Sequence, residues 1–121
     1  MFWRGAVLEL ARSGADIVGA VSFHGDLVSP QPAERGQVRA SLLALHGSED
    51  PVAPKADRDA FEAEMQAASA HWHLLSFGGV VHAFSDKGVD MMPVAKFDQW
   101  ASDLSHDIAD RFLRAAFKLN R

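Results

Sequence analysis

The chain has 121 residues, which is enough for one domain, and its 12 Lys and Arg against 16 Asp and Glu give a formal net charge of −4. This charge offers no basic surface for nucleic acid or anionic membrane, and the absence of cysteine excludes disulfides, thiolate nucleophiles and cysteine-based zinc sites. No apolar run approaches the roughly 18 residues of a bilayer span, and the N-terminus lacks a signal-peptide pattern. We therefore expect a cytoplasmic protein.

The N-terminal third predicts a helix followed by a buried strand. Apolar residues at helical spacing predict a helix over Phe2–Ser13, with Gly14 at the position that often ends a helix. The run Asp16–Phe23 is apolar almost throughout, which is typical of a strand buried on both faces. Residues 25–37 hold two glycines and two prolines and predict a loop.

The remaining two thirds predict two strands and two helices around a sheet. In chain order we expect a strand over Val38–Leu45, a helix that starts at Pro54, a strand over Trp72–Phe77, a loop over Ser85–Pro93 and a long helix over Val94–Phe117. The order α-β-β-α-β-α predicts an α/β fold of about three parallel strands with covering helices. The strand Asp16–Phe23 is too apolar for a solvent-facing edge.

Two stretches carry the chemistry. Residues 41–54, SLLALHGSEDPVAP, place Glu49 and Asp50 directly after an apolar run, and residues 80–84, VVHAF, place His82 after another. A strand that ends in an acid-bearing loop, then a helix, then a strand that ends in a histidine-bearing loop, is how α/β-hydrolases supply two members of a catalytic triad. A histidine held by a carboxylate is a competent general base, and Glu49 remains an alternative acid to Asp50.

Three blocks in this order resemble one family. VLELARSGADIVGAVSFHG, LLALHGSEDPVAP and LLSFGGVVHAF are similar to the C-terminal half of the dienelactone hydrolase family. The resemblance implies a partial α/β-hydrolase fold in which Asp50 is the triad acid and His82 is the triad base. It also implies that the strand Asp16–Phe23 is an interior strand of a larger sheet.

The departures from the family pattern concern the nucleophile and the substrate. The family nucleophile is a cysteine, or a serine in some relatives, in a Gly-x-Cys-x-Gly-Gly elbow, and counting back places that elbow at Met1–Arg4, where neither residue occurs. We therefore expect residues 1–121 to form a truncated domain that lacks the N-terminal half and the nucleophile elbow. Family members that bind carboxylate substrates can carry an arginine four residues after the histidine, and Asp86 stands there, which would repel a carboxylate.

Other candidate groups give weaker signals. Ser48 and Ser85 lie close in sequence to the acid and the base, but neither lies in a strand-to-helix elbow. His71 and His73 share one face of a strand, which is a metal-binding spacing, but no acid lies near them, so we predict neither a metal nor a cofactor. His24 and His46 end their strands and are expected to line the same rim of the sheet as His82. Phe2 and Trp3 are candidates for an exposed interface.

Two functional hypotheses follow, and a third concerns the sequence itself. The first is a dienelactone hydrolase-like protein without family hydrolase activity on its own, which forms a homodimer through the strand Asp16–Phe23 or the first helix. The alternative is a carboxylic-ester or lactone hydrolase that uses His82 and Asp50 with a nucleophile from a partner chain or a rebuilt dimer site. The third is that the sequence is a fragment of a longer reading frame. A small ester or lactone is the expected ligand, and neither nucleic acid nor membrane is an expected partner.

Overall fold

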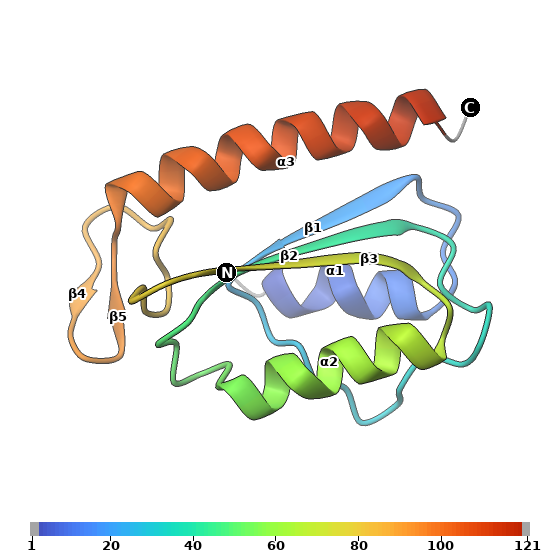
Figure 1. Ribbon diagram of the computed structural model, residues 1–121, viewed down its shortest axis with the longest axis horizontal. Coiled ribbons are helices and arrows are strands. Elements are labelled where there is room, and N and C mark those ends of the chain that lie inside the picture. The colour runs from blue at the N-terminus through green and yellow to red at the C-terminus, as the bar shows by residue number, and fades with distance from the viewer. Residues whose placement is uncertain (1–2, 120–121) are drawn as a thin grey trace.

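The computed structural model describes residues 3–119, with side chains from Ala6 onward, and Figure 1 shows an α/β fold. The elements in chain order are α1 (Trp3–Arg12), β1 (Gly19–Phe23), β2 (Ser41–Gly47), α2 (Lys55–Ala67), β3 (His71–Phe77), β4 (Asp90–Met91), β5 (Ala95–Lys96) and α3 (Gln99–Leu119). The predicted fold class, α/β with three parallel strands and covering helices, is confirmed. No helix within residues 3–119 combines the length and apolar character needed to cross a bilayer.

The main sheet has the order β1-β2-β3, and both pairs of neighbouring strands are parallel. All seven residues of β2 are buried, whereas β1 and β3 alternate between more and less covered positions. Helices α1 and α2 lie on one face of the sheet and α3 lies on the other (Figure 1). The central strand is therefore covered on both faces and along both edges.

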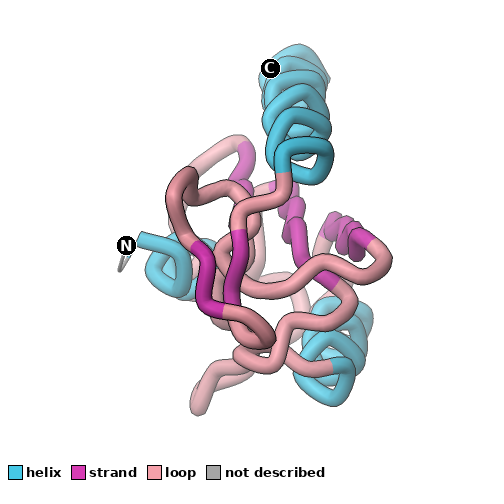
Figure 2. The backbone as a smooth tube through the Cα atoms, turned by 90° about the vertical axis from the view of Figure 1, so that its left-hand side faces the viewer, coloured by secondary structure: helices cyan, strands magenta, loops and turns pink. Residues whose placement is uncertain are grey.

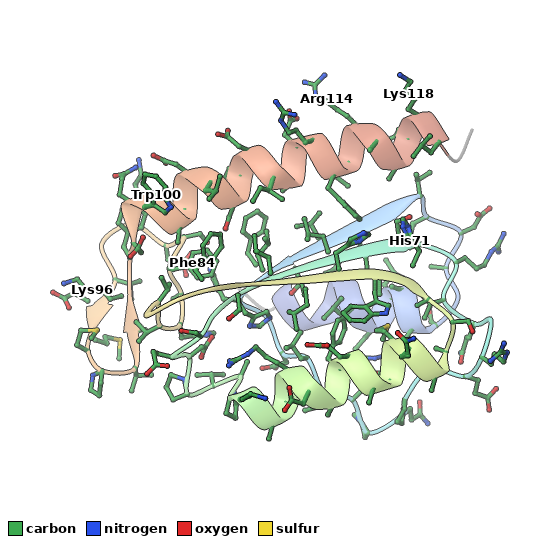
Figure 3. All side chains as sticks on the ribbon, viewed as in Figure 1. His71, Phe84, Lys96, Trp100, Arg114 and Lys118 are labelled. Atoms are coloured by element: carbon green, nitrogen blue, oxygen red, sulfur yellow. The ribbon has the colours of Figure 1, made fainter. Side chains whose placement is uncertain are left out.

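Two apolar clusters fill the two faces of the sheet. Leu42 and Ala44 of β2 pack with α1 and α2, where Phe61 and Met65 are buried. The alternate residues Leu43 and Leu45 pack on the side of α3, since successive strand residues point to opposite faces. Figure 3 shows Phe84, another buried member of this second cluster, beneath the start of α3.

The predicted N-terminal elements are correct in kind and differ at their ends. Helix α1 ends at Arg12, and Gly14 adopts φ 85°, the left-handed conformation expected after a helix. Strand β1 begins at Gly19 rather than Asp16, because the backbone turns before it through a hydrogen bond from Ile17 N–H to the Ala15 carbonyl. Helices α1 and α3 cover the two faces of β1, as expected for a strand buried on both faces, but within the described residues no strand pairs with its outer edge, so β1 is an edge strand and not the interior strand of a larger sheet.

The C-terminal prediction placed the start of the last helix too early. Residues 94–96 do not begin a helix, because Ala95–Lys96 pairs as an antiparallel hairpin with Asp90–Met91, which lies in the predicted loop Ser85–Pro93. Figure 2 shows these two short strands side by side in front of the main sheet. Helix α3 begins at Gln99, where the Asp98 carboxylate accepts a hydrogen bond from Ala101 N–H and caps the first turn.

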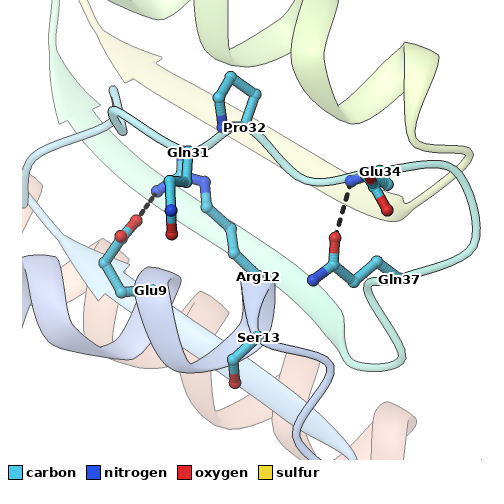
Figure 4. A pocket seen from close by; sticks show the side chains of 7 residues that line it. All are labelled: Glu9, Arg12, Ser13, Gln31, Pro32, Glu34 and Gln37. Carbon is cyan, nitrogen blue, oxygen red and sulfur yellow. Dashed lines mark hydrogen bonds and ion pairs between the residues drawn. The ribbon is translucent and has the colours of Figure 1, made fainter.

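A buried ion pair joins α1 and α2, the two helices on the same face of the sheet. Arg12 at the end of α1 donates two hydrogen bonds of 2.8 Å to the two carboxylate oxygens of Glu64 on α2. Arg12 also binds Glu9, and Figure 4 shows both side chains in a polar hollow of about 450 Å³. Glu64 in turn accepts the N–H of Ala33, so one carboxylate fixes α1, α2 and the loop between β1 and β2.

Candidate active site

The two predicted triad residues meet at the C-terminal rim of the sheet. Asp50 lies three residues beyond the end of β2, and His82 lies five residues beyond the end of β3. The Asp50 side chain is fully buried, and the His82 side chain is 19% exposed. His82 Nδ1 donates a hydrogen bond of 2.9 Å to Asp50 Oδ2, so the lone pair of the neutral imidazole lies on Nε2 and faces away from the acid.

The acid is oriented by its own loop. Asp50 Oδ1 accepts hydrogen bonds from the backbone N–H groups of Val52 at 2.8 Å and Ala53 at 3.2 Å. Burial alone raises the pKa of Asp50, but the hydrogen bond and charge of His82, together with these two N–H donors, lower it further than burial raises it. The net pKa is below the usual 3.8, so Asp50 is a carboxylate at neutral pH and can stabilise a protonated His82.

Arg58 of α2 binds the acid loop, which is the loop after β2 that carries Asp50. Its guanidinium, in a residue only 9% exposed, donates hydrogen bonds to the carbonyls of Gly47, Ser48 and Ala53. These carbonyls belong to the turn whose N–H groups bind Asp50. Arg58 therefore fixes the turn from its outside while Asp50 fixes it from within, a role that the sequence pattern did not indicate.

The acid loop and the loop after β3 that carries His82, the base loop, are in direct backbone contact. A Cβ atom on Gly47 would lie 2.2 Å from the carbonyl oxygen of Val80, so only glycine fits there. Beside this contact Glu49 N–H donates to the Val80 carbonyl at 2.9 Å, and Gly79 N–H donates to Ser48 Oγ at 2.7 Å. The distance between Asp50 and His82 thus follows from the packing of two loops against each other.

The small hairpin holds the base from the other side. His82 N–H donates to the Val94 carbonyl at 3.1 Å, and Lys96 N–H donates to the His82 carbonyl at 3.0 Å. Strands β4 and β5 therefore serve the site by fixing the backbone of His82. Sequence reasoning missed this role, because two strands of two residues each leave no periodic pattern.

His24 and His46 lie at the same rim as His82. The rings of His24 and His82 meet edge to face with centres 5.4 Å apart, and His24 Nε2 is 2.6 Å from Ser85 Oγ. His46 is fully buried, and neither of its ring nitrogens has a hydrogen-bond partner among the described residues. Burial, with smaller effects from the charges of Arg58 and His82, lowers the pKa of His46 to about 4 despite the opposing Asp50, so this ring is neutral near pH 7.

The described residues place no nucleophile beside His82. The chain has no cysteine, and among residues 6–119 no serine hydroxyl is hydrogen-bonded to His82, since Ser48 is bound to Gly79 and Ser85 to His24. Glu49 is exposed and does not take the place of Asp50. The region where the resemblance puts the elbow, Met1–Arg4, and the predicted interface residues Phe2 and Trp3 lie outside the described side chains.

His71 and His73 lie far from this site, at the beginning of β3. Within residues 3–119 no group of three or more His, Cys, Asp or Glu side chains is arranged to hold a metal ion. The catalytic roles of Asp50 and His82 stay predictions, and the geometry on which they depend is that of an acid–base pair.

Comparison with known proteins gives the chain a family and a fold. A model of the dienelactone hydrolase family matches residues 5–110. A dienelactone hydrolase-like promiscuous phosphotriesterase from metagenomic libraries is 29% identical with a TM-score of 0.83, and the match covers 93% of this chain and 48% of that chain. MGS-M1, an α/β-hydrolase enzyme from a Medee basin deep-sea metagenome library, is 17% identical with a TM-score of 0.66 over 93% of this chain and 51% of that one, which shows the fold alone. No curated protein matches the sequence. The chain spans about half the length of these solved structures.

Replacing Gly47 with alanine tests the contact between the two loops. We expect Gly47→Ala to lower the free energy of unfolding by about 3 kcal/mol, because the new methyl group overlaps a backbone carbonyl that cannot rotate away. Chemical denaturation measures this change. The matched control is Gly78→Ala, where a Cβ meets nothing within 4 Å, and equal stabilities of the two variants would contradict the role given to Gly47.

The buried imidazole of His46 predicts a loss of stability in acid. The pKa of His46 is about 4 in the folded chain against 6.5 for the free group. Between these two pH values the imidazole binds a proton in the unfolded chain and does not in the folded chain. The contribution of this group to the free energy of unfolding is fully present above pH 6.5. It falls by about 3 kcal/mol as the pH drops from 6.5 to about 4. In urea unfolding between pH 7 and pH 4, His46→Leu should show a correspondingly smaller decline than wild type. Parallel declines would refute this assignment.

Proposed function

The chain belongs to the dienelactone hydrolase family, and from this premise we propose that its residues supply the acid and the base of a carboxylic-ester or lactone hydrolase site without hydrolysing esters by themselves. The observation that carries this proposal is the 2.9 Å hydrogen bond between His82 and a buried, ionised Asp50. We further propose the cytoplasm as its compartment, since a chain without cysteine suits a reducing environment.

The pair supports the proton transfers of acyl transfer. His82 Nε2 accepts the proton of an attacking hydroxyl or thiol as that group adds to the ester carbonyl, and it then returns the proton to the leaving alcohol. Asp50 stabilises the imidazolium between these two steps and holds the ring in the tautomer that keeps Nε2 basic. Burial of the carboxylate strengthens its effect on His82.

The pair is not a complete catalyst. Loss of any triad member lowers the rate by about 10⁴-fold or more, and the described residues bring no nucleophile to His82. The missing group must come from outside the described side chains or from another chain.

We also propose that the outer edge of β1, with which no described strand pairs, joins a second copy of the chain. His24 N–H donates to the Leu45 carbonyl, and Ser41 N–H donates to the Val18 carbonyl. The backbone N–H and C=O groups of the even-numbered residues along this strand therefore point toward β2. In a parallel ladder alternate residues face opposite neighbours, so Gly19, Val21 and Phe23 present N–H and C=O groups to the outer edge. An apolar strand with such an edge is a template for strand addition.

The symmetry of such a dimer has a consequence for catalysis. A two-fold axis perpendicular to the sheet pairs the two copies of β1 antiparallel, in a six-stranded sheet. The C-terminal rims of the two halves then lie at opposite ends, with one Asp50–His82 pair at each. A second copy joined at this edge therefore does not bring a nucleophile to His82.

The alternative function is a working hydrolase completed by another chain or segment. A strand that pairs parallel to the outer edge of β1 ends at the same rim as β2 and β3, beside His24 and His82. The solved structures that match this chain are about twice its length, so segments of suitable size exist in its relatives. This alternative needs the same acid and base, and an experiment with a supplied nucleophile separates it from the first proposal.

Hydrolysis of p-nitrophenyl butyrate tests the proposed division of labour. The pure chain should release p-nitrophenol no faster than its His82→Ala variant. Co-expression with the half of the metagenomic phosphotriesterase that this chain does not cover should give turnover, and His82→Ala or Asp50→Asn should lower it by about 10³- to 10⁴-fold. Glu49→Gln is the matched control, because this neighbouring acid is exposed, and it should retain full turnover.

Turnover by the pure wild-type chain well above that of His82→Ala would contradict the first part of the proposal. Complemented turnover that survives both His82→Ala and Asp50→Asn would contradict the assignment of the acid and base.

Self-association is tested by light scattering at micromolar concentration. Wild type should have the mass of two chains. Val21→Pro should be a monomer with its fold retained, since proline removes an N–H that faces the outer edge and leaves the hydrogen bonds to β2 intact. A monomeric wild type, or an unchanged dimer in Val21→Pro, would rule out this interface.

A further inference from the structure

A hollow at the opposite end of the sheet from Asp50 and His82 is lined by two histidines. It has a volume of about 250 Å³ and lies between the first residues of β2 and β3 and the last turns of α3. Ser41 begins β2 and His46 lies five residues later, so this hollow is about 17 Å from the catalytic rim along the strand. The acid–base pair therefore does not explain the histidines gathered here.

The two histidines project from the same face of one strand. His71 and His73 alternate with Trp72 on β3, and their ring centres lie 4.9 Å apart. Helix α3 packs on β1 and β2, and both histidines are exposed residues beside it, with the His73 ring edge to face against Phe112. Figure 3 shows His71 between the sheet and α3.

Each ring is oriented by a hydrogen bond from Nδ1 to the neighbouring strand β2. His73 Nδ1 lies 3.1 Å from the Leu42 carbonyl, which can only accept, so this nitrogen carries the proton and Nε2 has the lone pair. His71 Nδ1 lies 2.8 Å from the hydroxyl of the buried Ser41, which can accept in the same way. Metal-binding histidines are held in this manner, with one nitrogen bound to the protein and the other free for the ion.

The spacing of the rings fits a shared ion. Two imidazoles bound at about 2.1 Å to one tetrahedral ion have ring centres about 5 Å apart, close to the 4.9 Å found here. The last turn of α3, with Ala116 and Leu119 at the hollow, adds the partial negative charge of a helix C-terminus. Lys118 points away from the sheet and away from His71 (Figure 3).

We propose that His71 and His73 chelate a late first-row divalent cation, such as Zn²⁺ or Ni²⁺, through their Nε2 atoms. Imidazole nitrogen is a preferred ligand for these ions. With two ligands from the protein, the remaining coordination positions open into the hollow beside Phe112 and can take water or a small exogenous ligand. The site is independent of ester hydrolysis and does not rest on the function proposed above.

Calorimetric titration of the purified chain with Ni²⁺, and separately with Zn²⁺, tests the site. One ion should bind per chain, and the affinity should fall at least about tenfold in His71→Ala and in His73→Ala, because either change replaces a chelate with a single ligand. The matched control is His106→Ala. His106 is another exposed histidine whose Nδ1 is bound to a backbone carbonyl, at 2.7 Å from Ser102, but it has no second histidine beside it on α3, and its removal should leave the affinity unchanged.

Nitrogen NMR of the imidazoles gives a second readout that does not depend on the stability of the variants. Zn²⁺ should shift the Nε2 resonances of His71 and His73 in the wild-type chain and leave those of His106 in place. Absence of binding at millimolar metal, equal loss in all three variants, or shifts confined to other histidines would overturn the proposal. So would a stoichiometry of one ion for two chains, since the chelate is built within one chain.

Discussion

The geometry of the candidate site depends on one steric constraint, the contact between Gly47 and the carbonyl of Val80. No side chain fits between these two backbones, so the loop that follows β2 and the loop that follows β3 pack as closely as two loops can. The hydrogen bond from Glu49 N–H to Val80 and the bond from Gly79 N–H to Ser48 Oγ form beside this contact. Asp50 and His82 are three and two residues away from it, and their separation is set by it. The rest of the rim, including Arg58 outside the acid loop and the β4–β5 hairpin behind the base, holds that arrangement in place.

The pair is preorganised for proton transfer, because its charge and tautomer are fixed before any substrate arrives. Asp50 has acceptor capacity for His82 and for two backbone N–H groups, and all three bonds favour the carboxylate. His46 supplies a neutral neighbour at the same rim, so it does not compete with His82 for the charge of Asp50. Preorganised charge of this kind costs no rearrangement during the reaction. The rim therefore holds both the proposed acid and the proposed base, and no nucleophile beside them is among the described groups.

The sequence predicts those parts of this structure that repeat a local pattern. The apolar run before His46 and the run before Gly78 predict two strands whose ends meet, and for that reason Asp50 and His82 could be brought together from sequence. The place of β1 at the edge of the described sheet could not be predicted, because Asp16–Phe23 is equally apolar whether a strand pairs on one side or on two. The start of α3 was placed early because Val94 and Phe97 continue its apolar spacing, while the competing hairpin is too short to have a pattern. The links from Arg12 to Glu64 and from Arg58 to three carbonyls depend on contacts between elements that no local pattern encodes.

The ion pair between Arg12 and Glu64 also determines which helices can unfold separately. The two residues are 52 positions apart, and any fluctuation that lifts α1 alone would leave a buried carboxylate without its partner, which is costly. Helices α1 and α2, with the loop that donates Ala33 N–H, should therefore unfold as one cooperative unit in native-state hydrogen exchange. Helix α3 rests on the other face through apolar side chains such as Ile108 and Phe112, and it can detach without breaking that pair. The two sides of the same sheet thus belong to different foldons, with the slowest-exchanging amides in β2 between them.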